Sequence, residues 1–170
     1  MDFSEILDKR YSCRRFSDKK VPAELIDKII EAGISAPTAV NMQPFKIFRM
    51  DSDKAKEAIH KATRFTFGAD CFLVIGCKKD DAWTRSFDGK NFAEVDASIA
   101  ATQMMLEITN LGLSTTWVGH FDVNLLKSLC TEMKDYELIA MFPIGYEADN
   151  SVPAAKHFKR KSYDEAVETL

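Results

Sequence analysis

The sequence lacks the residue patterns that build a metal centre, a membrane span or a hydrolytic active site. Its four cysteines form no CxxC pair and have no metal-ligand spacing with the three histidines. The longest apolar runs, 71–77 and 138–144, are about seven residues each, whereas a bilayer span needs roughly 20. We find no Ser-His-Asp set, Cys-His couple or paired-carboxylate motif, and no Gly-x-Gly-x-x-Gly after a strand. The sequence therefore predicts neither a metal site nor a dedicated Rossmann site for a dinucleotide.

Length and charge indicate one globular domain without a general affinity for polyanions. The 170 residues fit a single domain, 1–170, and 46% of them are apolar. The net charge of −3 gives no overall attraction to nucleic acid or to an anionic membrane. The N-terminal segment lacks the apolar stretch of a signal peptide, so we expect a cytoplasmic protein. Most of the cysteines have apolar neighbours and are expected in the core; a reactive Cys13 in its basic surroundings is the alternative.

Hydrophobic periodicity predicts a mixture of helices and strands without strict βαβ order. Helices are expected over 3–9, 22–33, 54–63, 92–110, 123–132 and 163–170, and strands over 45–50, 71–77, 115–118 and 137–146. The continuous apolar run 71–77 is typical of a central strand that is covered on both faces. The polar segment 78–91 is expected as an exposed loop. This mixture favours an α+β fold with a largely antiparallel sheet.

The segment 92–110 is the strongest helix prediction in the chain. Its apolar and small residues leave little polar surface on any side, which indicates a buried central helix or an interface helix. Gly112 follows it at the expected C-terminal position.

Ten of the 23 Lys and Arg residues fall in two short stretches, 9–20 and 156–161. The first contains six basic residues and one Asp, and the second contains four basic residues and one His. Within the first, Arg10, Ser12 and Arg14 offer two guanidinium groups and a hydroxyl, which can donate charge-assisted hydrogen bonds to phosphate oxygens. We therefore expect an anionic ligand, with solvated loops or helix faces as the alternative.

Five segments between residues 10 and 167 carry further motifs. They are 10–16 (RYSCRRF), 36–45 (APTAVNMQPF), 112–121 (GLSTTWVGHF), 141–146 (MFPIGY) and 160–167 (RKSYDEAV). In this order, they resemble the nitroreductase family of FMN-dependent oxidoreductases. The resemblance implies a homodimer with a three-layer α/β/α fold and two FMN sites at the subunit interface. It also implies that the C-terminal tail, about 148–170, packs on the partner subunit.

The resemblance assigns a set of cofactor-binding residues. They are Arg10, Tyr11, Ser12, Arg14, Pro37, Thr38, Asn41, Gln43, Trp117, Val118, Gly119, His120, Arg160 and Lys161. Arg10 and Ser12 are expected to bind the phosphate, helped by Arg160 and Lys161. Arg14 is expected beside the pyrimidine edge of the flavin, where a positive charge stabilises the reduced anion.

The segment 37–43 is expected to reach the flavin from the partner subunit, through Pro37, Thr38 and Asn41. The amides of Asn41 and Gln43 suit the flavin's mixed donor and acceptor edge, and turn formation is the alternative role of these residues.

Two departures from the family pattern concern the substrate side of the site. His120 stands where relatives usually have glycine. Three interpretations of His120 are open: it shapes the pocket or supplies a proton, it packs in the core, or it faces solvent. The segment 60–70 lacks the Asn that larger nitroreductases place against the flavin. The substrate pocket is then expected from aromatic side chains of two loops, Phe65, Phe67, Trp83 and Phe87, and core or surface packing is the alternative.

The activity that the resemblance implies is transfer of electrons from NAD(P)H, through bound FMN, to electron-poor acceptors such as nitroaromatics or quinones. The sequence does not distinguish NADH from NADPH, because a nicotinamide held transiently over a flavin needs no motif of its own. Three alternatives remain open at this point: other flavin chemistry of family relatives (dehalogenation or flavin fragmentation), a flavin storage or sensor protein, and an interaction protein whose basic ends bind an acidic partner.

Overall fold

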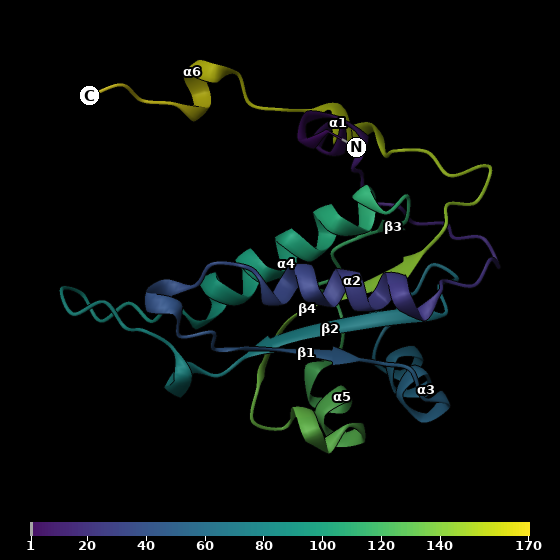
Figure 1. Cartoon of the computed structure of the whole chain (residues 1–170), viewed down its shortest axis with the longest axis horizontal. Coiled ribbons are helices and arrows are strands. Elements are labelled where there is room, and N and C mark those ends of the chain that lie inside the picture. The colour runs from purple at the N-terminus through teal and green to yellow at the C-terminus, as the bar shows by residue number, and fades with distance from the viewer. Residues whose placement is uncertain (1) are drawn as a thin grey trace.

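A four-stranded antiparallel sheet forms the centre of the molecule (Figure 1). The computed structural model describes residues 2–170. The strands are β1 (Phe45–Arg49), β2 (Cys71–Cys77), β3 (Ser114–Thr115) and β4 (Glu137–Gly145), in the spatial order β1-β2-β4-β3. The largely antiparallel sheet expected from the sequence is confirmed.

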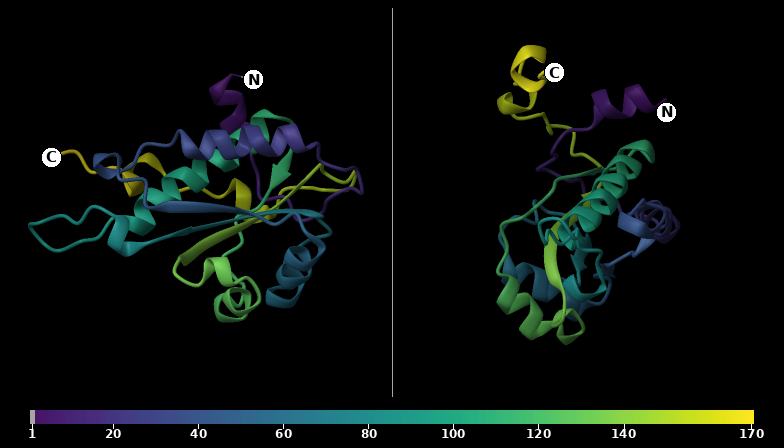
Figure 2. Two further views of the ribbon diagram at one scale, coloured as in Figure 1. Left: turned by 60° about the horizontal axis from the view of Figure 1, so that its bottom comes forward. Right: turned by 90° about the vertical axis from the view of Figure 1, so that its left-hand side faces the viewer.

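Helices cover both faces of this sheet (Figures 1 and 2). One face carries α2 (Ala23–Ile34) and α4 (Ala93–Asn110), and the other carries α3 (Asp53–Ala62) and α5 (Val123–Leu129). The short helix α1 (Phe3–Lys9) packs beside α4. The α+β class and the three-layer α/β/α arrangement are therefore confirmed.

Strand β2 is the central strand that its apolar run predicted. Successive side chains point to opposite faces of a strand, so Leu73 and Ile75 enter the core under α2 and α4, whereas Phe72 and Val74 enter the core over α3 and α5. All four are fully buried. One strand thus joins the two hydrophobic cores of the molecule.

Helix α4 is buried along most of its length, and it packs closely on α2. A Cβ atom added at Gly33 of α2 would lie 2.7 Å from Cγ of Met104, so glycine permits this close approach of the two helices. The helix ends at Asn110 with Leu111 as its C-cap, and Gly112 follows with a φ of +73°, as expected for a C-terminal glycine. Its outer face leaves Ile99 38% exposed.

Three elements are shorter than their sequence patterns predicted. Helix α5 ends at Leu129 because Cys130 leaves the helical region (φ −124°, ψ 84°), and a separate 3-10 turn covers Thr131–Met133. Strand β3 pairs only over Ser114–Thr115, although Val118 pairs again with Met141. Helix α6 covers only Tyr163–Ala166, since no core packs against it and isolated short helices gain little stability.

The C-terminal tail leaves the body of the molecule after β4. It runs past α1 and ends far from the sheet (Figure 1). Its apolar side chains have little cover, with Val152, Phe158 and Tyr163 between 73% and 76% exposed.

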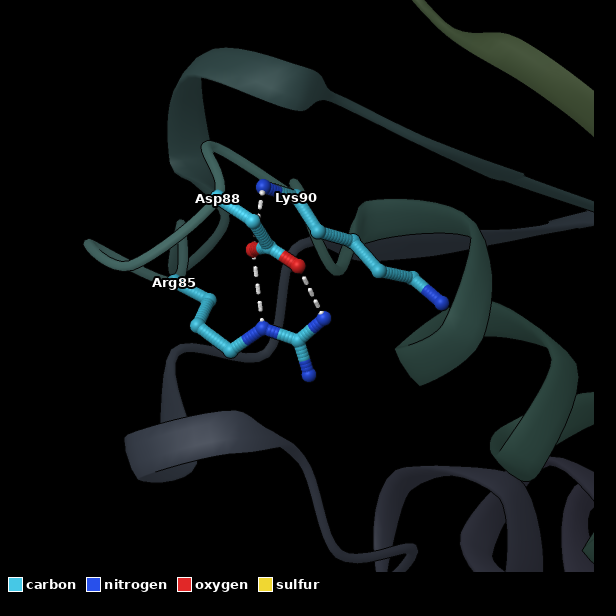
Figure 3. A network of polar contacts seen from close by, with 3 residues as sticks. All are labelled: Arg85, Asp88 and Lys90. Carbon is cyan, nitrogen blue, oxygen red and sulfur yellow. Dashed lines mark hydrogen bonds and ion pairs between the residues drawn. The ribbon is translucent and has the colours of Figure 1, made fainter.

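The segment between β2 and α4 is an exposed loop, as predicted. Arg85 Nε donates to Oδ1 of Asp88 at 2.8 Å, and the Lys90 backbone N–H donates to the same carboxylate (Figure 3). The loop carries Phe87, which is 96% exposed, near its tip.

The four cysteines are free thiols, and two of them are strongly shielded. Cys13 and Cys77 are completely buried, and Cys13 Sγ lies 3.2 Å from the carbonyl oxygen of Arg15. Burial raises the pKa of the Cys77 thiol to about 11. The structure thus favours a core role for Cys13 over the reactive alternative. Within residues 2–170, no helix combines the length and apolar composition that crossing a membrane requires.

Phe72→Ala should lower the apparent free energy of unfolding by about 3–5 kcal/mol, because it empties a fully buried site between two helices and the sheet. The same substitution at the exposed Phe87 should change it by less than about 0.5 kcal/mol. Urea unfolding of both variants measures the difference, and equal effects would contradict the position assigned to the core.

Candidate cofactor site

The basic segment 10–16 is fixed along the β3 edge of the sheet. Ser12 forms a parallel bridge with Thr115, and the Cys13 backbone N–H donates to the Thr115 carbonyl oxygen at 3.0 Å. Phe16 packs against Gly145, where an added Cβ atom would lie 3.0 Å from the ring. These contacts place the candidate phosphate ligands beside the segment that follows β3.

The two basic ends of the chain meet beside this edge. The half-buried guanidinium of Arg10 lies close enough to Arg160 that the charge of Arg160, together with the larger effect of burial, lowers the pKa of Arg10. Among residues 2–170, neither guanidinium forms an ion pair with a carboxylate. Because like charges that meet without a counterion repel each other, this pair is suited to an anionic ligand.

The other cationic candidates, Arg14 and Lys161, lie on the surface. Arg14 is exposed, and its Nη1 donates to the Ser12 carbonyl oxygen at 3.1 Å. Arg160 Nη1 donates to the carbonyl oxygens of His157 and Lys159. Lys161 is exposed directly after Arg160.

Tyr11 connects the N-terminal segment to the beginning of the tail. Its hydroxyl lies 2.9 Å from Oγ of Ser151, and its ring lies 6.3 Å from the ring of His157. Burial raises the pKa of the Tyr11 hydroxyl to about 12, and the nearby carboxylate of Glu147 adds to the effect. Tyr11 therefore acts as a neutral hydrogen-bonding group that holds the two ends together.

The segment after β3 offers unused backbone donors near the sheet edge. Trp117 packs on Phe142 with 5.4 Å between ring centroids, and Val118 exchanges two backbone hydrogen bonds with Met141 at 3.0 Å. Gly119 and His120 follow and are exposed. In the part of the chain that the structure describes, neither of their backbone N–H groups donates a hydrogen bond. These amides can donate to a bound cofactor.

The segment 37–43 forms a strained turn. Val40, Asn41 and Gln43 have φ values of 53°, 56° and 52°, in the left-handed region that residues other than glycine seldom adopt. The Gln43 backbone N–H donates to Oγ1 of Thr38 at 3.0 Å, and the Gln43 side-chain amide donates to the Asn41 carbonyl oxygen. Pro37 is exposed at the start of this turn.

Asp96 of α4 holds this turn in place. It is only 1% exposed, and its Oδ1 accepts a hydrogen bond from the Ala39 backbone N–H at 3.0 Å. Its Oδ2 is buried and has no hydrogen-bond partner within residues 2–170. Asp96 was not among the predicted site residues, although a carboxylate among the apolar residues of 92–110 was a signal.

One chain does not bring all the candidate residues together. The turn 37–43 is held by the N-terminal end of α4, whereas the basic segment lies beside β3, which follows the C-terminal end of α4 (Figure 1). Fourteen further residues of α4 follow Asp96 up to Asn110, which corresponds to about 21 Å along the axis. The structure therefore holds Arg10, Ser12 and Arg14 beside Thr115, two residues before Trp117, with Arg160 near Arg10, and leaves the turn 37–43 apart.

Comparison with known proteins identifies similar sequences and folds. The model of the Nitroreductase family matches residues 7–66 and 60–146. A nitroreductase family protein from Clostridium difficile 630 is 34% identical in sequence, with a TM-score of 0.89 over 100% of both chains. A protein from Methanothermobacter thermautotrophicus, provisionally named NADH dehydrogenase/NAD(P)H nitroreductase, is 29% identical in sequence. The aligned region covers 88% of this chain and 80% of that protein. A provisional nitroreductase from Exiguobacterium sibiricum, solved in complex with FMN, shares the fold at 18% identity with a TM-score of 0.84 over 100% of this chain and 98% of its own.

Asp96→Ala should accelerate hydrogen exchange at the Ala39 amide by about two- to tenfold, because a buried hydrogen bond contributes about 0.5–1.5 kcal/mol. Asp96→Asn should preserve most of the protection, since its amide oxygen can accept the same bond. Exchange followed by mass spectrometry measures this effect. Glu94→Ala, which removes an exposed carboxylate from the same helix, is the control. Unchanged exchange in Asp96→Ala would show that the turn does not depend on Asp96.

Proposed function

Because this chain belongs to the nitroreductase family, we propose that it is an oxidoreductase that binds FMN and transfers electrons from NAD(P)H to electron-poor small molecules. Nitroaromatics and quinones are the expected acceptors. The reaction balances when NAD(P)H gives up a hydride and becomes NAD(P)+, while a quinone takes two electrons and two protons, one of them from solvent. The observation that supports this proposal most directly is the contact of Tyr11, the neighbour of Arg10, with Ser151 and His157 of the tail, which brings the two basic stretches together.

The residues at the β3 edge have the chemistry that FMN requires. Arg10 and Arg160, with Ser12 and Lys161, would hold the phosphate through charge-assisted hydrogen bonds. The free backbone N–H groups of 119 and 120 would donate to polar atoms of the flavin ring. When bound, FMN supplies the two-electron chemistry that none of the protein side chains offers.

Arg14 would have an electrostatic role in this site. Its guanidinium is held beside Ser12 by a hydrogen bond to the backbone, so its charge has a defined position. A fixed positive charge beside the flavin favours the reduced anion over the neutral oxidised ring. Arg14 would therefore raise the reduction potential of the bound flavin.

We propose that the complete site is formed by a homodimer. In its own chain, the turn 37–43 is separated from the cationic pair by about the length of α4. A second copy would therefore supply Pro37, Thr38, Asn41 and Gln43 to the site. An apolar groove of about 750 Å³ between α1 and the outer face of α4, lined by Phe3, Val95, Ile99 and Leu106, would be covered by that copy. The exposed apolar side chains of the tail 148–170 would pack on the partner in the same way.

Purified protein should show the visible absorption of oxidised flavin, and Arg10→Ala should weaken FMN binding by about 1.5–3 kcal/mol. Fluorescence titration of apoprotein with FMN measures the loss, and Lys28→Ala on the outer surface of α2 serves as a control that changes charge equally. Anaerobic addition of NAD(P)H should bleach the flavin band. A band that persists would indicate a storage protein, and a colourless protein without FMN affinity would exclude both functions.

Ile99→Asp should convert the dimer into monomers and lower FMN affinity with it, because it places a charge on the apolar outer face of α4. Light scattering gives the mass, and circular dichroism shows that the fold persists. Leu125→Asp on α5, in the opposite helical layer, introduces the same charge at a similarly exposed apolar residue and should leave the dimer intact. A parent protein that is monomeric at micromolar concentration and still binds FMN would refute the shared site.

A further inference from the structure

A second pocket adjoins the candidate cofactor site at Gly119 and His120. It has a volume of about 790 Å³ and lies between the segment after α3 and the segment before α5, two helices that lie side by side (Figure 2). Its lining includes His60, Lys61, Arg64, Phe65, His120 and Asp122. Because it begins where the free backbone donors of 119 and 120 lie, a molecule bound here would adjoin the cofactor.

Hydrogen bonds tie the two walls of this pocket together. Thr63 Oγ1 donates to the His120 carbonyl oxygen at 2.8 Å, and the Asp122 backbone N–H donates to the Ala62 carbonyl oxygen at 2.8 Å. The Phe65 backbone N–H donates to Oγ1 of the same Thr63. The pocket is therefore formed before any ligand arrives.

Aromatic rings form one surface of the pocket. The ring of Phe65 lies 5.3 Å from the ring of His120 in an edge-to-face arrangement and 5.9 Å from the ring of Phe67. Trp83 and Phe87, which the sequence grouped with these residues, lie elsewhere: Trp83 packs on Phe92 and Phe87 is exposed on its loop. A planar, electron-poor ring could pack on the Phe65 surface.

The charge at the pocket is positive and is carried by Arg64. Its guanidinium carbon lies 5.1 Å from the centroid of Phe65, and within residues 2–170 it forms no ion pair. The other charged groups at the rim are occupied, since Lys61 pairs with Glu57 at 2.7 Å and Asp122 caps α5 by accepting from the Leu125 N–H. Arg64 is thus the rim cation that is available to an anionic substituent.

We propose that this pocket binds the electron acceptor and selects planar, electron-poor aromatics that carry a carboxylate. The ring packs against Phe65 and His120, and the carboxylate pairs with Arg64. The inference rests on the proposed function, because the pocket serves an acceptor only if a flavin is bound beside it. NADPH carries a phosphate that offers Arg64 another anionic partner. The experiment therefore distinguishes the carboxylate of an acceptor from the phosphate of NADPH.

The test measures binding of 4-nitrobenzoate and of its neutral analogue 4-nitrobenzamide to the FMN-loaded protein by calorimetry. Arg64→Gln should weaken nitrobenzoate binding about three- to tenfold and change nitrobenzamide binding less than about twofold, as expected for one partly solvated ion pair. Arg64→Lys should retain most of the affinity, and Lys28→Gln is the control with an equal change of charge. In turnover, the KM for nitrobenzoate should rise with little change in kcat.

Equal affinities of the parent and Arg64→Gln proteins for nitrobenzoate would overturn the assignment. A KM for NADPH that rises in Arg64→Gln, while the KM values for NADH and nitrobenzoate do not, would overturn it in favour of the dinucleotide phosphate. FMN content and bleaching by NADH are measured in the same samples. If both are normal, a negative result concerns the acceptor pocket alone, whereas a parent protein without FMN would refute the proposed function itself.

Discussion

The pairing of the basic segment with β3 is the interaction on which the candidate site depends. The Ser12–Thr115 bridge places the N-terminal cations along the sheet edge, and Thr115 is itself held to β4 because its buried Oγ1 donates to the Pro143 carbonyl oxygen at 2.7 Å. Through β4, this edge is continuous with the central strand β2 and both cores. The position of Arg10 and Arg14 is therefore determined by the sheet, although both residues lie on a surface segment.

Helix α4 determines which residues can share a site. Its N-terminal end holds the turn 37–43 through Asp96, and its C-terminal end leads into β3 and the segment 117–120. A rigid helix of 18 residues keeps these two groups apart in one chain, and a homodimer that packs α4 against its counterpart would bring them together. The apolar outer face of α4 is consistent with that arrangement.

The sequence predicted best those features that depend on local pattern. The run Cys71–Cys77 matched β2 at both ends, and the expected helix 92–110 differs from α4 by one residue. Features that depend on contacts between distant segments were not predictable. The partner of Asp96 lies 57 residues away, and the contact between Phe65 and His120 joins two loops whose proximity depends on the packing of α3 and α5. The motifs grouped the candidate ligands, but only the fold shows which of them one chain assembles.

The length of α4 has a consequence for how the protein would retain its cofactor. In the proposed dimer, each flavin would be enclosed by two chains, so subunit association and cofactor affinity would be thermodynamically linked. Dilution that separates the subunits would remove the turn 37–43 from the flavin and leave the phosphate held by the cations alone. Cofactor saturation would then depend on protein concentration as well as on the supply of FMN, and free FMN would in turn favour assembly.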